Sequence, residues 1–299
     1  MKTILIGSVI SSYIVLKAII DEHFPITYVF SLDEKYSENV SGYYPLHNLA
    51  SEYDIPFKTF HKIGDSENIQ IMREIQPDYI FVIGLSQLVK KELLDCAKKG
   101  VIGFHPTPLP RFRGRAAMVW QMLLGVENTK CTLFFIDEGM DSGDIIDQQE
   151  YVIEKTDYAK DAERKLCDAL AVMIPRVLRK IVDGSITARK QNEKEATYLL
   201  IRRPEDGLID WNEPVEKIQR LIRAVSEPYP GAFSMYDGEH KIVIWKADYM
   251  ENKKYIGIPG QICEINNDTF DILGIDGIIR VLKYENIDNV RLFVGHKMK

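Results

Sequence analysis

The stretch DYIFVIGLSQLVKKELLDCAKKGVIGFH, residues 78–105, contains two apolar runs separated by a segment with helical periodicity. The runs at 78–84 and 100–105 have the length of buried strands, and residues 91–99 between them have the length of a short helix. Two such strands joined by a helix form a parallel pair with a right-handed crossover. The stretch therefore predicts an α/β domain that binds ligands beyond the carboxyl ends of its strands, where His105 stands.

The same alternation of apolar runs and helical periods fills the first half of the chain. We expect strands at 3–8, 26–32 and 58–62, and helices at 10–22, 43–54 and 66–76. The predicted architecture is a doubly wound, mostly parallel, Rossmann-like sheet. The turn after the first strand is not Gly-x-Gly-x-x-Gly, which argues against a dinucleotide cofactor.

The pattern changes after residue 150. An amphipathic helix is expected at 157–184, ended by Gly184, and a shorter one at 210–225 with Asp210 as a candidate N-cap. Short alternating strands with turns such as Asp237-Gly238 then predict a smaller antiparallel β domain, barrel-like in form. We divide the chain into a catalytic domain, 1–190, and a linker helix with the barrel-like domain, 191–299.

Composition excludes several classes of protein. The chain has 299 residues, 45% of them hydrophobic and 27% charged, with a net charge of −6, so it is globular and offers no general surface for nucleic acid or anionic membrane. Four widely spaced cysteines without a Cys-x-x-Cys pair indicate reduced thiols and no metal site. The apolar run at the N-terminus is interrupted at 11–13, as in a strand that runs into a helix, so we expect a cytoplasmic protein.

Two segments contain residues suited to acid–base chemistry. In GFHPTPLPRFRGR, residues 103–115, three prolines hold the chain extended after His105. In CTLFFIDEGMDSGDII, residues 131–146, a strand runs into an acidic turn that contains Asp141. A histidine and an aspartate at neighbouring strand ends form a plausible acid–base pair.

FHPTPLPRFRGR followed by DEGMDSGDI resembles the folate-dependent formyltransferases, which act on methionyl-tRNA, glycinamide ribonucleotide or amino-sugar nucleotides. His105 and Asp141 are 36 residues apart, as the catalytic pair of that family is. The resemblance implies transfer of a formyl group from 10-formyltetrahydrofolate to a primary amine. His105 would stabilise the oxyanion or carry the proton, and Asp141 would orient His105 and help deprotonate the amine.

The resemblance also implies where the folate binds. The residues implied to bind it are Gln87, Leu88, Val89, Arg115, Asp137, Glu138, Gly139 and Met140. One position departs from the family: Gly103 stands where the family has an Asn whose amide helps to hold the oxyanion. Loss of such a donor typically costs about 10²–10³ in rate, so either another donor replaces it, with Gln87 and Thr107 as candidates, or the enzyme is slow, or the chain is a non-catalytic relative.

Two segments indicate which class of molecule carries the acceptor amine. SLDEKYSENVSGYY, residues 31–44, is acidic where tRNA-acting members have a basic insertion, and it would repel a phosphate backbone. Arg202 and Arg203 suit a pyrophosphate. We therefore predict an amino-sugar nucleotide as substrate, with no nucleic-acid or membrane partner. Methionyl-tRNA formylation, formyltetrahydrofolate hydrolysis and a non-catalytic binding relative remain alternatives, and the oligomeric state is left open, a homodimer included.

Overall fold

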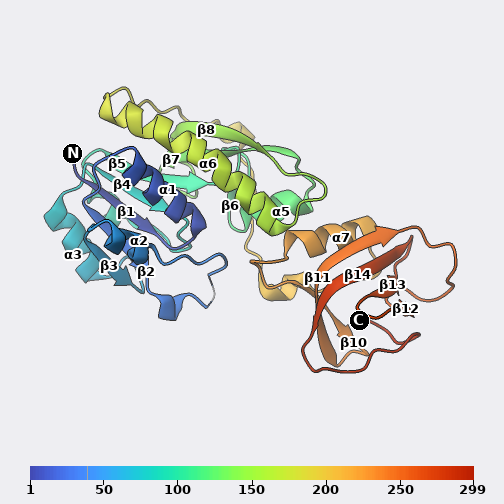
Figure 1. Cartoon of the computed structure of the whole chain (residues 1–299). Helices are drawn as coiled ribbons and strands as arrows, with labels where there is room; N and C mark the ends of the chain where they lie inside the picture. Colours follow the sequence, from blue (N-terminus) through green and yellow to red (C-terminus); the bar gives the residue numbers. More distant parts are fainter. Residues whose placement is uncertain (39) are drawn as a thin grey trace. The chain divides into compact units, whose positions relative to one another are not determined.

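A computed structural model describes residues 1–38 and 40–299 (Figure 1). The chain forms two compact units, each assembled from separate segments. Unit 1 comprises residues 1–117, 128–152 and 164–200, and unit 2 comprises 118–127, 153–163 and 201–299. The division into domains at residue 190 stays a prediction.

Unit 1 is built on a seven-stranded sheet with the order β3-β2-β1-β4-β5-β7-β8. The first five strands in this order run parallel, and β7 is antiparallel to both of its neighbours, which confirms the mostly parallel sheet. Edge strand β8 was not predicted. The strands are β1 (Thr3–Gly7), β2 (Tyr28–Leu32), β3 (Phe57–Phe60), β4 (Tyr79–Ile83), β5 (Gly100–His105), β7 (Asn128–Phe135) and β8 (Ile145–Val152).

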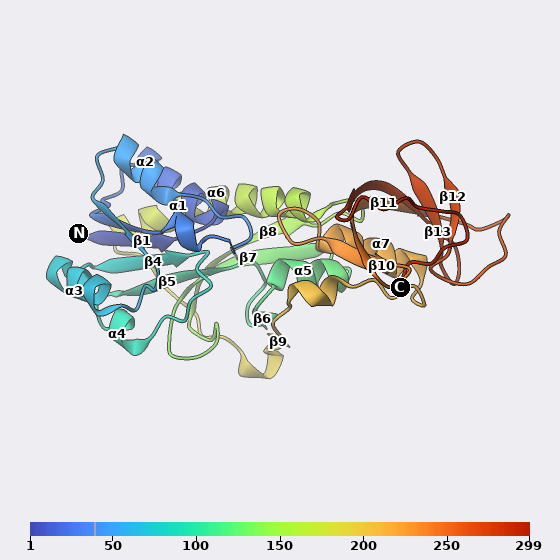
Figure 2. The ribbon, with the colours of Figure 1, turned by 90° about the horizontal axis from the view of Figure 1, so that it is seen from below.

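Helices cover both faces of this sheet, as a doubly wound fold requires. Figure 2 shows α1 (Ile10–Asp21), α2 (Leu46–Glu52) and α6 (Ala159–Val182) over one face. It shows α3 (Ser66–Ile75) and α4 (Lys91–Leu94) over the other. All five residues of β4 are buried, because that strand lies in the middle of the sheet between two helical layers.

Short elements follow the sheet strands near the predicted site. Strand β6 (Arg113–Gly114) pairs in parallel with β9 (Tyr198–Leu199), which lies far along the chain. The remaining short elements are α5 (Ala117–Leu123) and the 3₁₀ turns η1 (Glu34–Tyr36), η2 (Glu193–Glu195) and η3 (Pro204–Gly207).

Unit 2 contains the predicted antiparallel barrel. Its strands are β10 (Ala232–Tyr236), β11 (His240–Met250), β12 (Ile262–Ile265), β13 (Phe270–Leu273) and β14 (Ile278–Asn286), in the order β10-β11-β14-β13-β12. The C-terminal residues bond to both edges of this sheet, through Lys299 to Met235 in β10 and through His296 to Ile262 in β12. The last residues of the chain thus close the sheet.

Helix α7 (Val215–Ala224) packs against β11 and begins later than predicted. Pro214 precedes its first turn, and the Asp210 carboxylate instead accepts a hydrogen bond from the backbone N–H of Asn212. Asp210 is therefore a turn residue, and its prediction as the N-cap was wrong. Among the described residues, no helix is long and apolar enough to cross a membrane.

Candidate active site

His105 is the last residue of β5, and its ring is fixed by the loop that follows. Its side chain is 8% exposed, and Nε2 lies 2.8 Å from the backbone oxygen of Phe112. A carbonyl oxygen only accepts hydrogen bonds, so Nε2 carries a hydrogen and donates it. Nδ1 is therefore the ring nitrogen available for proton exchange.

Asp141 faces that nitrogen. Its Oδ2 lies 3.7 Å from His105 Nδ1, within ion-pair range, and accepts a hydrogen bond of 2.8 Å from the backbone N–H of Gly114. Asp141 has a φ of 51°, a left-handed conformation that is costly for a non-glycine residue and concentrates at functional sites. The structure brings the two predicted catalytic residues together. Asp141 is the more open of them, with 25% of its side chain exposed.

The loops predicted to hold folate lie next to one another. Arg115 donates from Nη2 to the backbone oxygen of Ser86 at 3.3 Å, which joins the loop after β6 to the loop after β4. Lys91 forms an ion pair of 3.3 Å with Glu138, which joins the start of α4 to the acidic turn after β7. The three segments that contain the predicted folate residues thus surround one region of unit 1.

Side chains within these loops have different surroundings. Leu88 is 78% exposed and Met140 58% exposed, so both present apolar surface to the solvent. Val89 is partly buried against the hydrophobic core, so its side chain contributes to packing. Asp137 accepts hydrogen bonds from the backbone N–H of Gly139 and the hydroxyl of Ser142, so it shapes the turn.

The donors expected to replace the family Asn are already bonded. Gln87 donates from Nε2 to the backbone oxygen of His61 at 2.6 Å and accepts at Oε1 from the N–H of Ile63 at 2.8 Å. The Thr107 hydroxyl is fully buried, and the backbone oxygens of Arg111 and Phe112 both lie within hydrogen-bond distance of it. The single Thr107 hydroxyl hydrogen is thus used within its own loop. Gln87 keeps a second Nε2 hydrogen beyond the one donated to His61, so its replacement of the family Asn stays a prediction.

Gly103 leaves its space to an apolar side chain. A Cβ at this position would lie 2.7 Å from Ile136 Cγ1, 2.9 Å from its Cδ1 and 3.1 Å from Phe134 Cε1. Gly103 and His105 point to the same face of β5, because side chains two apart in a strand do so. The glycine does not have a positive φ. Ile136 therefore occupies the place in which the family's Asn side chain would begin.

A cavity that was not predicted lies at the carboxyl ends of β1 to β4. It measures about 140 Å³ and is lined by Ser8, Leu32, Tyr36, Val40, His61, Leu85, Ser86 and Gln87. The rings of Tyr36 and His61 stack with centroids 3.8 Å apart. His61 directly follows β3, whereas Tyr36 ends η1, four residues after β2. The cavity shares residues 86–87 with the predicted folate loop.

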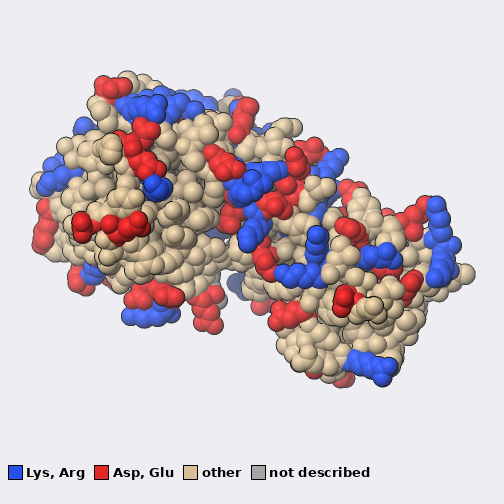
Figure 3. All heavy atoms as spheres, in the orientation of Figure 1, with Lys and Arg blue, Asp and Glu red and all other residues tan. Residues whose placement is uncertain are grey.

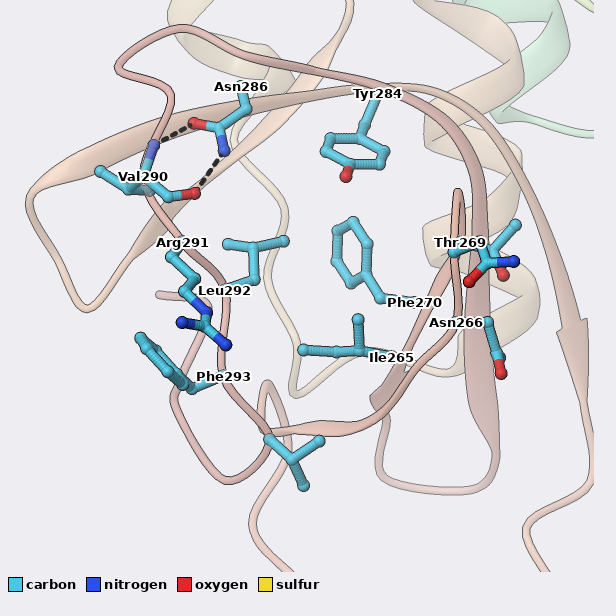
Figure 4. Close-up of a pocket in the computed structure, with 12 residues that line it drawn as sticks. Ile265, Asn266, Thr269, Phe270, Tyr284, Asn286, Val290, Arg291, Leu292 and Phe293 are labelled. Atoms are coloured by element: carbon cyan, nitrogen blue, oxygen red, sulfur yellow. Dashed lines mark hydrogen bonds between the residues drawn. The ribbon is translucent and has the colours of Figure 1, made fainter.

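Unit 2 has a larger cavity, of about 440 Å³. Figure 4 shows Phe270 and Tyr284 on one side of it, Arg291 and Phe293 on the other, and Asn286 bonded to the backbone of Val290. Among the described residues that line it there is no histidine, aspartate or glutamate, and Tyr284 is the group suited to acid–base chemistry. The predicted acid–base pair, His105 and Asp141, lies in unit 1.

The two arginines predicted for the substrate differ in their surroundings. The Arg202 guanidinium lies 5.0 Å from the ring centroid of Trp120 and donates to the backbone oxygen of Asp206. Burial lowers the pKa of Arg202 below its ordinary value. Arg203 is exposed. On the face shown in Figure 3, basic and acidic side chains are interspersed in both units.

Two models of known protein families match this chain. The model of the formyl transferase family matches residues 27–178, and that of the formyl transferase C-terminal domain matches residues 202–290. The chain belongs to the formyl transferase family. The family recognised from the two motifs is thus confirmed.

Solved structures of relatives share the fold of this formyl transferase. HypX from Aquifex aeolicus is 16% identical with a TM-score of 0.70, the match covering 96% of this chain and 44% of that one. The chain thus spans less than half the length of HypX. An N-formyltransferase from Helicobacter canadensis, in complex with folinic acid and dTDP-3-aminofucose, is 21% identical (TM-score 0.65, 95% and 100% covered). Methionyl-tRNA formyltransferase from Clostridium thermocellum is 21% identical (TM-score 0.61, 93% and 100% covered).

Proposed function

We propose that this formyl transferase moves a formyl group from 10-formyltetrahydrofolate to the primary amine of an amino-sugar nucleotide. The observation that carries the proposal is the His105–Asp141 pair, in which Nδ1 and Oδ2 lie 3.7 Å apart, with Asp141 in one of the contacting segments implied to bind folate. An acid–base pair in that place suits transfer to an amine, because the amine must lose a proton as it attacks the formyl carbon.

The loops fit a folate in chemical character. A pterin and its adjoining ring are flat and largely apolar, and exposed Leu88 and Met140 offer apolar contact on adjoining loops. Backbone groups in the turn shaped by Asp137 offer donors and acceptors for the polar edge of a pterin. The folate supplies the activated formyl carbon, and the protein supplies its position.

The protein's part in the reaction follows from the two ring nitrogens of His105. Nε2 is bound to the Phe112 carbonyl, so Nδ1 exchanges the proton, and the Asp141 carboxylate stabilises the imidazolium that results. Asp141 is the more exposed group, so it takes the proton of the amine through a water molecule and passes it to His105 Nδ1, which leaves Asp141 as a carboxylate beside the imidazolium. The N–C bond to the acceptor amine forms, the bond from the formyl carbon to the folate nitrogen breaks, and His105 returns the proton to that nitrogen.

Three observations support a nucleotide sugar as the acceptor. Residues 31–44 contain η1, and Lys35 in it forms an ion pair with Asp33, the residue before it. Among the described residues of this segment, which leave out residue 39, no basic side chain is therefore free to bind a phosphate backbone. The Helicobacter canadensis relative is described in complex with a dTDP amino sugar. Arg202, beside Trp120, offers a cation and an aromatic face suited to a nucleotide.

The test is a screen of amino-sugar nucleotides with 10-formyltetrahydrofolate, in which tetrahydrofolate release is followed by its absorbance. Release that requires an amino sugar, and is lost when the amine is replaced by hydroxyl, supports the proposal. Release of tetrahydrofolate and formate at the same rate without any amine identifies a hydrolase. Folate binding without release identifies a non-catalytic relative.

A further inference from the structure

The backbone of the acidic turn is held by a side chain from a distant part of unit 1. Gln191 lies 50 residues beyond Asp141, after α6, and is 9% exposed. Its Nε2 donates to the backbone oxygen of Asp141 at 2.7 Å and to that of Gly143 at 2.7 Å. Both hydrogens of the amide are thus used to hold the turn that carries the Asp141 carboxylate.

Gln191 is held in turn by Arg113. The guanidinium donates to Gln191 Oε1 from Nε at 3.1 Å and from Nη2 at 2.8 Å. Its other three N–H groups donate to the two carboxylate oxygens of Glu193 and to the hydroxyl of Tyr198. All five donors of this arginine, which is 1% exposed, therefore have acceptors. The orientation of the Gln191 amide is fixed, because its oxygen must face the guanidinium.

Residues 112–114, which are β6 and the residue before it, hold both members of the proposed catalytic pair. The backbone oxygen of Phe112 holds His105 Nε2, and the backbone N–H of Gly114 holds the Asp141 carboxylate. Arg113 lies between them in sequence and reaches Asp141 through Gln191. The cost of the left-handed backbone at Asp141 is offset by these contacts.

We propose that Gln191, oriented by Arg113, is a positioning residue that holds the Asp141 turn so that its carboxylate faces His105 Nδ1. This inference rests on the proposed formyl transfer at that pair. Gln191 contacts the Asp141 backbone and not the reacting atoms, so it acts through Asp141. Without its two N–H donors the turn relaxes, the Gly114–Asp141 hydrogen bond weakens, and the carboxylate moves away from the ring.

Two variants of Gln191 test the proposal. Gln191→Leu removes the amide, and Gln191→Glu keeps its volume and an oxygen for Arg113 but presents no N–H to the turn. We expect each to lower kcat by about 10–100-fold, with the KM for 10-formyltetrahydrofolate changed less than about threefold. Gln219→Leu is the matched control, because Gln219 in unit 2 also accepts from an arginine, Arg223, and donates to a backbone oxygen. It should retain wild-type kcat.

A double-mutant cycle separates positioning from general damage. If Gln191 acts through Asp141, Gln191→Leu should cost less than about twofold in kcat once Asp141 is replaced by Asn. A full 10–100-fold loss in the Asp141→Asn background would show that Gln191 acts elsewhere and would overturn the proposal. So would unchanged kcat in both single variants.

A measurement without turnover keeps the inference separate from the proposed activity. Arg113-Gly114 is the only Arg-Gly step in the sequence, so labelling Arg carbonyls with ¹³C and Gly amides with ¹⁵N isolates the Gly114 N–H by NMR. We expect this amide to exchange at least about tenfold faster in Gln191→Leu than in the wild type. Unchanged exchange would overturn the proposal even if formyl transfer is established. Faster exchange in a protein without transfer activity would support the positioning and refute only the proposed function.

Discussion

Adding a side chain at Gly103 tests whether Ile136 fills the place of the family's Asn. An alanine there would put its Cβ 2.7 Å from Ile136 Cγ1, closer than ordinary van der Waals contact. Replacing a glycine whose φ is negative by alanine normally stabilises by about 0.4–1 kcal/mol, through the unfolded chain. Overpacking a filled site costs about 1–3 kcal/mol. The cost of overpacking exceeds the gain from the stiffer unfolded chain, so we expect the free energy of unfolding to fall by about 0.5–2 kcal/mol.

Thermal unfolding measures the sign of this change. For a domain of 150–250 residues the loss corresponds to a Tm lowered by roughly 1–8 °C in Gly103→Ala, and Gly103→Asn should fall at least as far. Both should also lower kcat, because Ile136 directly precedes the turn that contains Asp141. In the background of Ile136→Ala the same substitutions should cost less, with a coupling of about 1–2 kcal/mol. A Tm that rises in Gly103→Ala, or a coupling below about 0.5 kcal/mol, would refute the reasoning.

Three further predictions follow from the site and its surroundings. Replacing His105 with Ala or Asp141 with Asn should lower kcat for formyl transfer by about 10²–10⁴-fold, while the circular dichroism spectrum stays unchanged. A variant that keeps more than about a tenth of the wild-type activity would exclude the replaced residue from catalysis. Initiator tRNA at micromolar concentration and about 0.15 M salt should not bind in a filter assay, whereas binding that weakens steeply with salt would indicate a phosphate-backbone surface. Burial raises the pKa of the Cys131 thiol to about 12, so the native protein at pH 8 should not be alkylated there until it is unfolded, and rapid labelling located by mass spectrometry would contradict the buried position.

The central strands were predictable because they are buried on both faces. Residues 78–84 and 100–105 are apolar runs of strand length, and they form β4 and β5. Strand β8, at the sheet edge, was not predicted, because its polar residues and partial exposure remove the apolar run that marks a central strand. The helix expected at 91–99 ends at Leu94, since Lys98 and Lys99 instead bond to the backbone at Pro77 and Asp78.

That His105 and Asp141 lie close together was predictable from strand ends and motif spacing, but the contacts that support Asp141 were not. Hydrogen bonds of a carboxamide to a backbone 50 residues away leave no periodic signal, so Gln191 was not predicted. Gln87 was expected near His105 because β4 and β5 are neighbours. Its amide instead bonds to the loop after β3, after a turn at Gly84 with a φ of 60°. Strand order fixes neighbours, whereas a loop's backbone decides the direction of a side chain.

The most direct test of the account follows the formyl carbon itself. 10-[¹³C]formyltetrahydrofolate is incubated with the protein and a dTDP amino sugar, and the products are analysed by mass spectrometry and ¹³C NMR. The account predicts the label in an amide on the sugar nitrogen, formed by the wild type and not by the Asp141→Asn variant. Label recovered only as formate, or an amide formed equally well by both proteins, would contradict formyl transfer at the His105–Asp141 pair.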